Sequence, residues 1–328
     1  MDYAKDIIIS SNLSLRRNIK GFDFPTSMTF DESLVIMDMV RNVFGDRLVL
    51  LADLDDETID KLISEMVLSE DVRNKLPQVG LIFEGDTTLV INDRDHISIN
   101  ISNFDLDLRG SYKRSVDIEK ILDGRFDFAF SSEYGYLTSG ARNAGYGLEI
   151  WMKLFLFGLI DGPKTYQGFE QAMVYAGIYP QKYIPQGLKS YADDLYLLKN
   201  YGNYRKDTEG YLRKVEKNIE TVVKNERRFR RDYKVLNNTD DRAVEEEINL
   251  IQKSLEAVLV KSLDKMMKAL YKLKKYQILG YDVDFSEEEI NSLIKKLNSS
   301  RYRENFDTER YELLMKEMGE SHGKQQIK

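Results

Sequence analysis

The sequence predicts an α+β protein, in which an antiparallel β-sheet flanked by helices is followed by an all-helical C-terminal domain. Two patterns support this prediction. Short apolar runs separated by tight turns lie between residues 79 and 102, and from Thr208 onward apolar residues recur three, four and seven positions apart. Strands joined by tight turns favour antiparallel pairing. Apolar residues three, four and seven positions apart are typical of amphipathic helices. We therefore predict an α/β domain over residues 1–230 and a helical domain over residues 231–328.

The first third of the chain alternates between strand and helix patterns. An apolar run at residues 7–9 leads into a polar loop, and Asp31 precedes a stretch with one apolar face that predicts an N-capped helix. A strand-like run over residues 47–54 and a second amphipathic helix from Asp55 follow. The clearest β region comes next, with expected strands at residues 79–83, 88–92 and 96–102.

The third of these strands alternates in polarity. Its isoleucines point to one face, whereas His96, Ser98 and Asn100 point to the other. Because His96 lies on the more polar face, we expect it not to be a buried core histidine.

The rest of the chain is expected to contain both strands and helices up to Thr208 and only helices after it. An apolar run over residues 150–160 suits a strand or a helix equally well by periodicity. The other expectations before Thr208 are a helix at 106–124, a helix at 169–175, irregular chain at 177–186 and a strand at 195–198. After Thr208 we expect helices at 208–233, 244–273, 287–297 and 307–318.

Composition excludes several classes of function. The formal net charge of −7 disfavours general nucleic-acid binding. Cysteine is absent, so the chain has no disulfide, thiolate metal site or cysteine nucleophile, and its two histidines cannot build a histidine-rich metal site. No apolar run is long enough to cross a bilayer and no signal-peptide pattern is present, so we expect a cytoplasmic protein without a membrane role.

A glycine-rich stretch at residues 134–147 separates the two halves of the α/β region. Its sequence is Tyr-Gly-Tyr-Leu-Thr-Ser-Gly-Ala-Arg-Asn-Ala-Gly-Tyr-Gly, and Trp151, the only tryptophan, follows it. Such a turn lets the backbone approach a ligand or another piece of chain closely. The sequence leaves these two interpretations open.

Three blocks of the chain carry motifs in a fixed order. Residues 10–18 read Ser-Ser-x-x-x-Leu-x-Arg-Asn, residues 90–99 read Val-Ile-Asn-Asp-Arg-Asp-His-Ile-Ser-Ile, and residues 135–147 contain Gly-Tyr-Leu-Thr-Ser and Asn-x-Gly-x-Gly. Together they resemble the phosphagen (ATP:guanidino) kinases, and among these the bacterial protein-arginine kinases. The resemblance implies a phosphagen-kinase catalytic domain followed by a helical domain. It also implies transfer of the γ-phosphoryl group of ATP to a guanidinium nitrogen.

The positions that bind phosphate in this family are changed. Its arginines supply the positive charge that phosphoryl transfer requires. The matching residues here are Asn12, Ser14, Ser98, Glu149 and Ala176. Glu149 places a negative charge where the family has a positive one.

The positions that hold the acceptor are changed as well. Where the resemblance implies a glutamate, a cysteine and a second glutamate, this chain has Arg94, Gly140 and Gln181. The loss of one contact to the transition state typically costs ~3 kcal/mol. Arg94 and Glu149 pair across the former site in one hypothesis, and each is solvated separately in the other, which we favour.

A remnant of a second family motif lies near the C-terminus. The bacterial kinases bind phosphoarginine through Arg-Asp-x-x-Arg-Ala in the helical domain, and only Asp307 and Arg310 match it here. The simpler interpretation is an ordinary helix start with Asp307 at its N-terminus.

The resemblance and the changes together predict a pseudokinase that regulates or scaffolds a bacterial arginine-phosphorylation and Clp quality-control system. We expect no cofactor and no catalytic residue. The partners that the resemblance implies are the zinc-binding activator of the kinase, the Clp unfoldase, an active kinase paralogue or a second copy of the chain. The alternative is an active, diverged ATP:guanidino phosphotransferase that uses ATP and Mg²⁺, with His96, Arg16, Arg17 and Arg142 as candidate phosphate-binding residues. A third possibility is that the cleft in which the resembling family binds its substrates holds another small ligand here.

Overall fold

The computed structural model describes residues 4–103, 106–161, 165–185, 188, 190–200, 207–256 and 262–300. The chain forms two compact units that interleave along the sequence. The first unit comprises Met1–Phe155, Gln167–Gln181 and Tyr196–Val223, and the second comprises Leu156–Tyr166, Lys182–Leu195 and Lys224–Lys328. The prediction of domains 1–230 and 231–328 places a single boundary where the compact units alternate several times.

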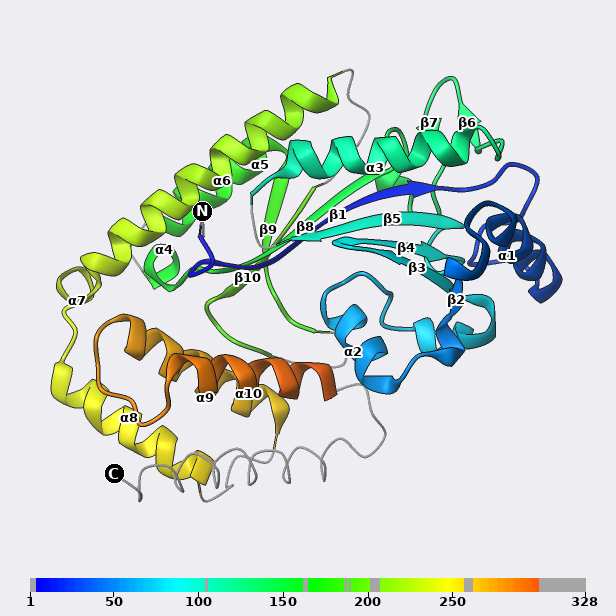
Figure 1. The fold of residues 1–328 in the computed structure, drawn as a ribbon. Helices are drawn as coiled ribbons and strands as arrows, with labels where there is room; N and C mark the ends of the chain where they lie inside the picture. Colours follow the sequence, from blue (N-terminus) through cyan, green and yellow to red (C-terminus); the bar gives the residue numbers. More distant parts are fainter. Residues whose placement is uncertain are drawn as a thin grey trace. The chain divides into compact units, whose positions relative to one another are not determined.

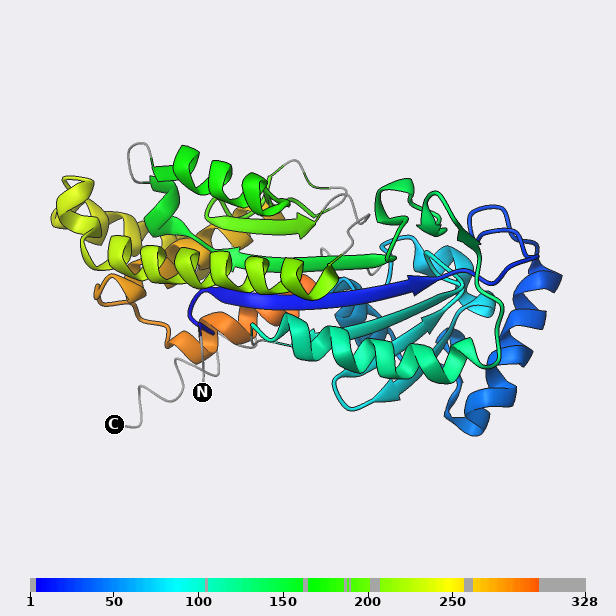
Figure 2. The same cartoon turned by 90° about the horizontal axis from the view of Figure 1, so that it is seen from above.

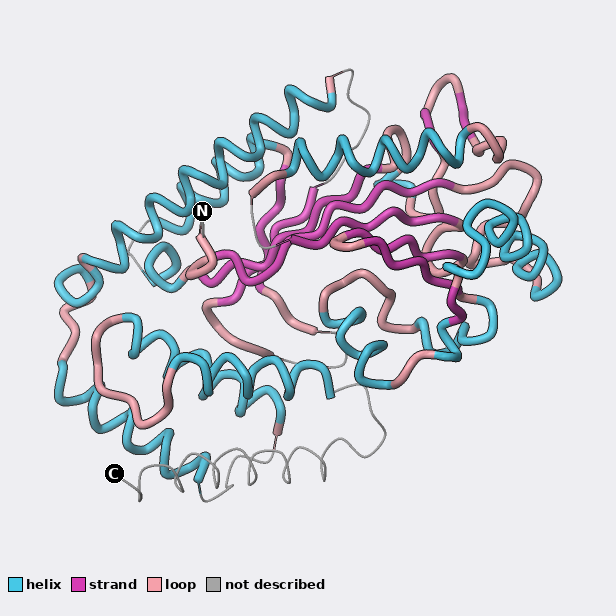
Figure 3. Tube along the Cα trace, viewed as in Figure 1, coloured by secondary structure: helices cyan, strands magenta, loops and turns pink. Residues whose placement is uncertain are grey.

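An eight-stranded sheet is the centre of the first unit, and its strands form one continuous layer (Figure 3). The strand order is β2-β3-β4-β5-β1-β8-β10-β9, and each pairing from β2 to β8 is antiparallel. The strands are β1 (Ile8–Arg17), β2 (Val49–Leu50), β3 (Gly80–Glu84), β4 (Thr87–Ile91), β5 (Ile97–Asn103), β8 (Leu148–Phe155), β9 (Ile178–Lys182) and β10 (Leu195–Asn200). A separate hairpin pairs β6 (Phe130–Ser131) with β7 (Gly135–Tyr136).

Helices cover the sheet. In the first unit, α3 (Leu108–Asp123), α5 (Thr165–Ala176) and the N-terminal part of α6 (Thr208–Arg231) lie on one face (Figures 1 and 2). The remaining helices of this unit are α1 (Phe30–Phe44) and α2 (Asp56–Ser64), with short 3-10 helices η1 (Gly45–Arg47), η2 (Leu51–Asp53), η3 (Val72–Gln78) and η4 (Ala141–Asn143). A capping box between Thr29 and Glu32 fixes the start of α1.

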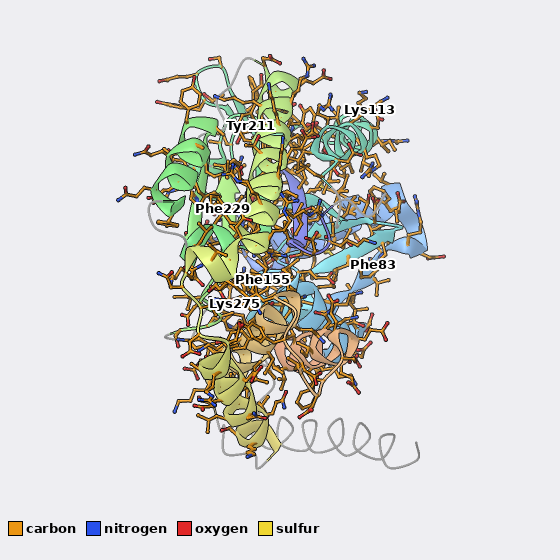
Figure 4. All side chains as sticks on the ribbon, turned by 90° about the vertical axis from the view of Figure 1, so that its left-hand side faces the viewer. Phe83, Lys113, Phe155, Tyr211, Phe229 and Lys275 are labelled. Carbon is orange, nitrogen blue, oxygen red and sulfur yellow. The ribbon has the colours of Figure 1, made fainter. Side chains whose placement is uncertain are left out.

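The alternation of side chains along the sheet separates an apolar face from a polar face. Leu15 pairs with Ile99 across β1 and β5, and both pack in a core cluster with Leu122 of α3 and Val40 of α1. Along β1, the neighbouring residues Asn12, Ser14 and Arg16 point to the opposite face. In the view with side chains, Lys113 lies on the outer side of α3 and Phe155 in the interior (Figure 4).

The second unit is helical. Its helices are α4 (Phe157–Asp161), α7 (Tyr233–Leu236), α8 (Asp241–Glu256), α9 (Leu263–Ile278), α10 (Glu287–Ser300) and the end of α6. Lys275 on α9 is a polar centre of this unit, because its ammonium lies 2.5 Å from Asp161 and 3.8 Å from Asp194. Burial raises the pKa of Asp194 to about 6, against the opposing effect of Lys275.

The structure confirms the predicted fold class, an antiparallel sheet flanked by helices with further helices at the C-terminal end. Several local predictions needed correction. The open choice at residues 150–160 resolves into β8 followed by α4, and β9 occupies part of the stretch predicted to be irregular. The single helix predicted over residues 244–273 is two helices, because Ser262 is extended before α9 begins. The helix predicted at 307–318, with Asp307 and Arg310, lies outside the described residues.

Candidate functional site

The polar face of the sheet brings together most of the positions that the sequence singles out. Ser14 of β1 lies opposite Asn100 of β5 on one side and Glu149 of β8 on the other. Arg16 lies opposite Ser98 in the same register. All five side chains are buried, and Glu149 is only 2 % exposed. Buried charges require partners, so the arrangement of Arg16 and Glu149 decides what this face can do.

Arg16 and Glu149 form a buried ion pair. One Arg16 nitrogen donates a hydrogen bond to Glu149, and the other, Nη1, lies 3.2 Å from Oδ2 of Asp95. Lys199 of β10 approaches the second oxygen of Glu149 at 3.1 Å. Arg16 and Lys199 are therefore both paired with Glu149, and Arg16 is also paired with Asp95. Lys199 was not singled out by the sequence, since no motif surrounds it.

Burial and the neighbouring charges shift the pKa values of Glu149 and Arg16 in opposite directions. Burial alone would raise the pKa of the Glu149 carboxyl, but the charges of Arg16, Lys199 and Arg94 lower it to about 2. Burial likewise lowers the pKa of Arg16, whereas Glu149 and Asp95 raise it, with a net rise. Both groups therefore remain ionised at neutral pH.

Arg94 is half-buried and makes no ion pair with Glu149 within the part of the chain that the structure describes. Its guanidinium donates to the carbonyl oxygens of Met66 and Leu68, and it lies 4.9 Å from the ring centroid of Trp151. Burial and the nearby Arg16 lower its pKa. Neither sequence hypothesis holds. Arg94 and Glu149 do not pair directly, because Glu149 pairs with Arg16 and Lys199. They are not separately solvated either, since Glu149 is buried and Arg94 donates to backbone carbonyl groups.

Several buried polar atoms on this face have no hydrogen-bond partner among the residues that the structure describes. Ser10 Oγ, Asn12 Oδ1 and Ser14 Oγ follow one another on β1, and Trp151 Nε1 lies on the residue opposite Asn12. Two of these positions, Asn12 and Ser14, are those where the resembling family has arginines. The side chains at these two positions are short and neutral, so they offer single hydrogen-bonding atoms and no bidentate contacts for phosphate.

His96 is a fully buried structural residue, which corrects the expectation from the alternation. The Ile19 amide donates to Nδ1 at 2.9 Å, and Nε2 lies 2.8 Å from the carbonyl oxygen of Asp23. Nδ1 must therefore be the unprotonated nitrogen and Nε2 must carry the proton. Burial lowers the pKa of the ring, although Asp23 and nearby carboxylates oppose this. Both nitrogens are engaged, so neither is free to bind a phosphate.

Asp95 and Asn18 connect three segments around His96. Asp95 Oδ1 accepts hydrogen bonds from Asn18 Nδ2 and from the Ser139 amide, both at 2.7 Å. Asn18 Oδ1 accepts the His96 amide at 2.9 Å. The end of β1, the start of β5 and the glycine-rich stretch are thus held by retained family residues in a structural role.

The glycines of the 134–147 stretch answer the question that the sequence left open. At Gly147, where φ is +65°, a Cβ would lie 2.4 Å from the carbonyl oxygen of Arg16. The close approach there is to the strand, not to a ligand. At Gly140 a Cβ would meet only Asn143 Nδ2 at 3.7 Å, so this position would accept a larger residue.

The other candidates lie outside this cluster. Arg17 points to the opposite face, where it pairs with Glu119 of α3 at 2.5 Å. Arg142 is exposed on η4, and Gln181 is exposed on β9. Ala176 is buried at the end of α5. Among the described residues, no group of three acidic or histidine side chains is arranged to hold a metal ion.

Solved structures with a similar fold include a taurocyamine kinase and a lombricine kinase. The substrate-free duplicated taurocyamine kinase from Schistosoma mansoni matches with a TM-score of 0.56 and 18% identity over 69% of this chain, which spans 34% of that protein. Lombricine kinase matches with a TM-score of 0.55 and 17% identity, over 69% of this chain and 67% of that one. At these identities the comparison establishes the fold.

The sequence comparisons establish the family. The model of the ATP:guanido phosphotransferase C-terminal catalytic domain matches residues 35–227, more than half of the chain. The chain therefore belongs to the ATP:guanido phosphotransferase family. Its curated relatives include the protein-arginine kinases of Caldanaerobacter subterraneus subsp. tengcongensis, 23% identical over 71% of this chain and 72% of the relative, and of Staphylococcus saprophyticus, 23% identical over 86% and 82%.

The described helices are all too short or too polar to cross a bilayer.

Proposed function

We propose that this protein is a protein-arginine-kinase-like pseudokinase, which does not transfer phosphoryl groups and acts as a regulatory or scaffolding subunit. Its setting in this proposal is the cytoplasm, within a bacterial arginine-phosphorylation and Clp protein quality-control system. The observation that carries the proposal is the buried Glu149, paired with Arg16 and Lys199 where the family has a phosphate-binding arginine.

The charge at Glu149 opposes nucleotide binding for two reasons. A phosphate about 4 Å from a carboxylate is repelled by about 4 kcal/mol at the effective dielectric of a protein surface. The nearby cations cannot compensate fully, because Arg16 and Lys199 are already paired with Glu149. Releasing Arg16 to bind a phosphate would leave a buried carboxylate with one fewer partner, which is costly.

The acceptor side of the site opposes phosphoryl transfer as well. Arg94 stands where the resembling kinases have a glutamate, and a guanidinium there repels an incoming guanidinium. Its hydrogen bonds to Met66 and Leu68 hold the end of the α2 segment against the sheet. The polar face thus supports an internally closed network better than an open pair of substrate sites.

One observation favours the alternative, an active and diverged ATP:guanidino phosphotransferase using ATP and Mg²⁺. Three cations, Arg16, Arg94 and Lys199, lie on the polar face close enough to Glu149 to lower its pKa. The unpartnered atoms of Ser10, Asn12 and Ser14 add hydrogen-bonding capacity there. A nucleotide that displaced Glu149 would find these groups.

An assay for both steps separates the two functions. The protein is titrated with ATP and Mg²⁺ by calorimetry, and an arginine-containing protein substrate is then examined for phosphoarginine, with an active protein-arginine kinase as the positive control. We expect neither binding at millimolar nucleotide nor product. Submillimolar binding together with phosphoarginine would establish the enzyme instead.

The scaffolding role requires protein partners. We propose the classes that protein-arginine-kinase systems offer: the zinc-binding kinase activator, the Clp unfoldase, an active kinase paralogue or a second copy of this chain. Binding of the purified protein to each candidate, measured separately, tests this part of the proposal.

A further inference from the structure

An open groove in the first unit is lined by residues at the C-terminal end of α3 and in the β6–β7 hairpin. Figure 1 shows where these two elements lie. The volume of the groove is about 660 Å³, and Asp123, Asp127, Phe130 and Tyr136 are among its lining residues. The groove is separate from the polar face. Tyr136 contacts Arg17, and Arg17 points away from the face to which the adjacent Arg16 contributes.

The floor of the groove is aromatic and accessible. Phe130 is 61 % exposed, although it is a large apolar side chain. Its ring packs edge-on against Tyr136, with 5.3 Å between the ring centroids. The guanidinium of Arg17 already lies 3.6 Å from the centroid of the Tyr136 ring, so one of these two rings binds a cation within the protein. An exposed aromatic beside such a ring marks an interaction surface.

The rim of the groove is acidic where it meets the helix. Asp123 is the last residue of α3, and within the described residues it makes no ion pair. The C-terminal end of a helix carries a partial negative charge that adds to this carboxylate. Asp127 pairs with Lys20 at 3.1 Å, but both side chains are exposed, and such a pair contributes only about 0–1 kcal/mol. Arg125 also lines the groove, so the rim is not uniformly acidic.

We propose that this groove binds an arginine side chain of an exposed, basic segment of a partner protein. A planar guanidinium can stack on an aromatic ring and donate hydrogen bonds to a carboxylate at its edge, which a lysine ammonium cannot do in the same way. Phe130 and Asp123 both line this groove. The accessible ring of Phe130 and the carboxylate of Asp123, which has no ion pair among the described residues, supply the two halves of this recognition. The inference names a partner chemistry for the proposed scaffolding role, and it does not depend on whether the polar face binds nucleotide.

The experiment measures peptide binding to the full chain at low ionic strength by fluorescence anisotropy. The probe is a fluorescein-labelled peptide with arginines spaced by glycine and serine, and its matched control carries neutral citrulline at each arginine. We expect the citrulline peptide to bind at least tenfold more weakly. Phe130→Ala and Asp123→Asn should each weaken binding of the arginine peptide about threefold to tenfold.

Two variants outside the groove control for non-specific effects. Asp117→Asn removes an exposed carboxylate from the same helix, and Phe83→Ala removes an exposed aromatic ring from β3. Both should bind the arginine peptide as the parent protein does. Equal binding of the two peptides, or equal weakening by groove and control variants, would overturn the proposal. Because all four substituted side chains are exposed, circular dichroism is expected to show an unchanged fold. Nucleotide titration of the same proteins tests the pseudokinase proposal separately.

Discussion

At the scale of single residues, one buried ion pair organises the charges of the polar face. Glu149 and Arg16 are adjacent on β8 and β1 and almost completely buried. Removing one partner of such a buried pair strongly destabilises the folded protein. The pair therefore serves as part of the buried core of the first unit.

The Glu149→Gln variant tests this role through its pH dependence. The pKa of Glu149 is about 2 in the folded protein against an ordinary 4.5, so its contribution is complete above pH 4.5 and is lost as pH falls toward 2. We expect the variant to lose about 3 kcal/mol of unfolding free energy at pH 7. Denaturant unfolding from pH 7 down to 3.5 should show this difference shrinking. Asp38→Asn, which removes an exposed pair with Arg41, is the control and should change little. A loss that is independent of pH would contradict the role of charge.

His96 gives a second prediction at this scale. Because burial lowers its pKa and both nitrogens are engaged, the ring should remain neutral and protonated on Nε2 at pH 6.5, where an exposed histidine is about half protonated. Nitrogen-15 NMR of the imidazole measures this directly, with a histidine-containing peptide as the reference. A ring that titrates at or above pH 6.5 would show that the hydrogen bonds to Ile19 and Asp23 do not persist.

The role of His96 could not be predicted from alternation alone. A period of two places His96 with Ser98 and Asn100, but it does not show whether a polar face is covered. Here Ser98 and Asn100 are buried as well, and residues 18–23 fold over the ring of His96. The pairing of Glu149 with Arg16 could not be predicted either, because the two residues are far apart in the sequence and only the pairing of β1 with β8 brings them together.

At the scale of elements, most helices and strands could be located from the sequence. The boundary between two neighbouring elements was misplaced where both have a similar hydrophobic pattern. Residues 150–160 contain a strand and a short helix, and both are buried, so their hydrophobic patterns merge. The pattern from Val244 to Leu273 continues across two helices because α8 and α9 each present an apolar face. The glycine-rich stretch was recognised correctly, but its contact with the backbone at Arg16 depends on the fold.

The helical unit provides a prediction through Asp194. Its folded pKa of about 6 exceeds the ordinary 3.8, so its ionisation costs stability as pH rises from about 4 through 6. Asp194→Asn avoids that cost. We expect the variant to gain about 3 kcal/mol relative to the parent between pH 4 and pH 7, as an upper estimate. Urea unfolding at both pH values measures the gain.

The neighbouring residue supplies a matched control for this prediction. Asp193 is exposed and pairs with Lys268 at 3.4 Å, so Asp193→Asn should show little dependence on pH in this range. If both variants behave alike, or if Asp194→Asn loses stability as pH rises, the inferred cost of burying Asp194 is wrong.

At the scale of the whole molecule, the chain has the fold and the family membership of the ATP:guanido phosphotransferases. Asn18, Asp95 and His96 hold segments together, and Arg94 and Glu149 engage other parts of the chain. Family membership was visible in the sequence because its turns and motifs are local. The closed network was not, because it depends on Lys199 and on the register of β1 with β8.

The central claim is that this network leaves no site for nucleotide, and calorimetric titration of the full chain with ATP and Mg²⁺ tests it most directly. An active protein-arginine kinase titrated in parallel shows that the conditions detect binding. We predict no saturable heat of binding for this protein up to millimolar nucleotide. Saturable binding below millimolar concentration, accompanied by phosphoarginine on a protein substrate, would contradict the claim.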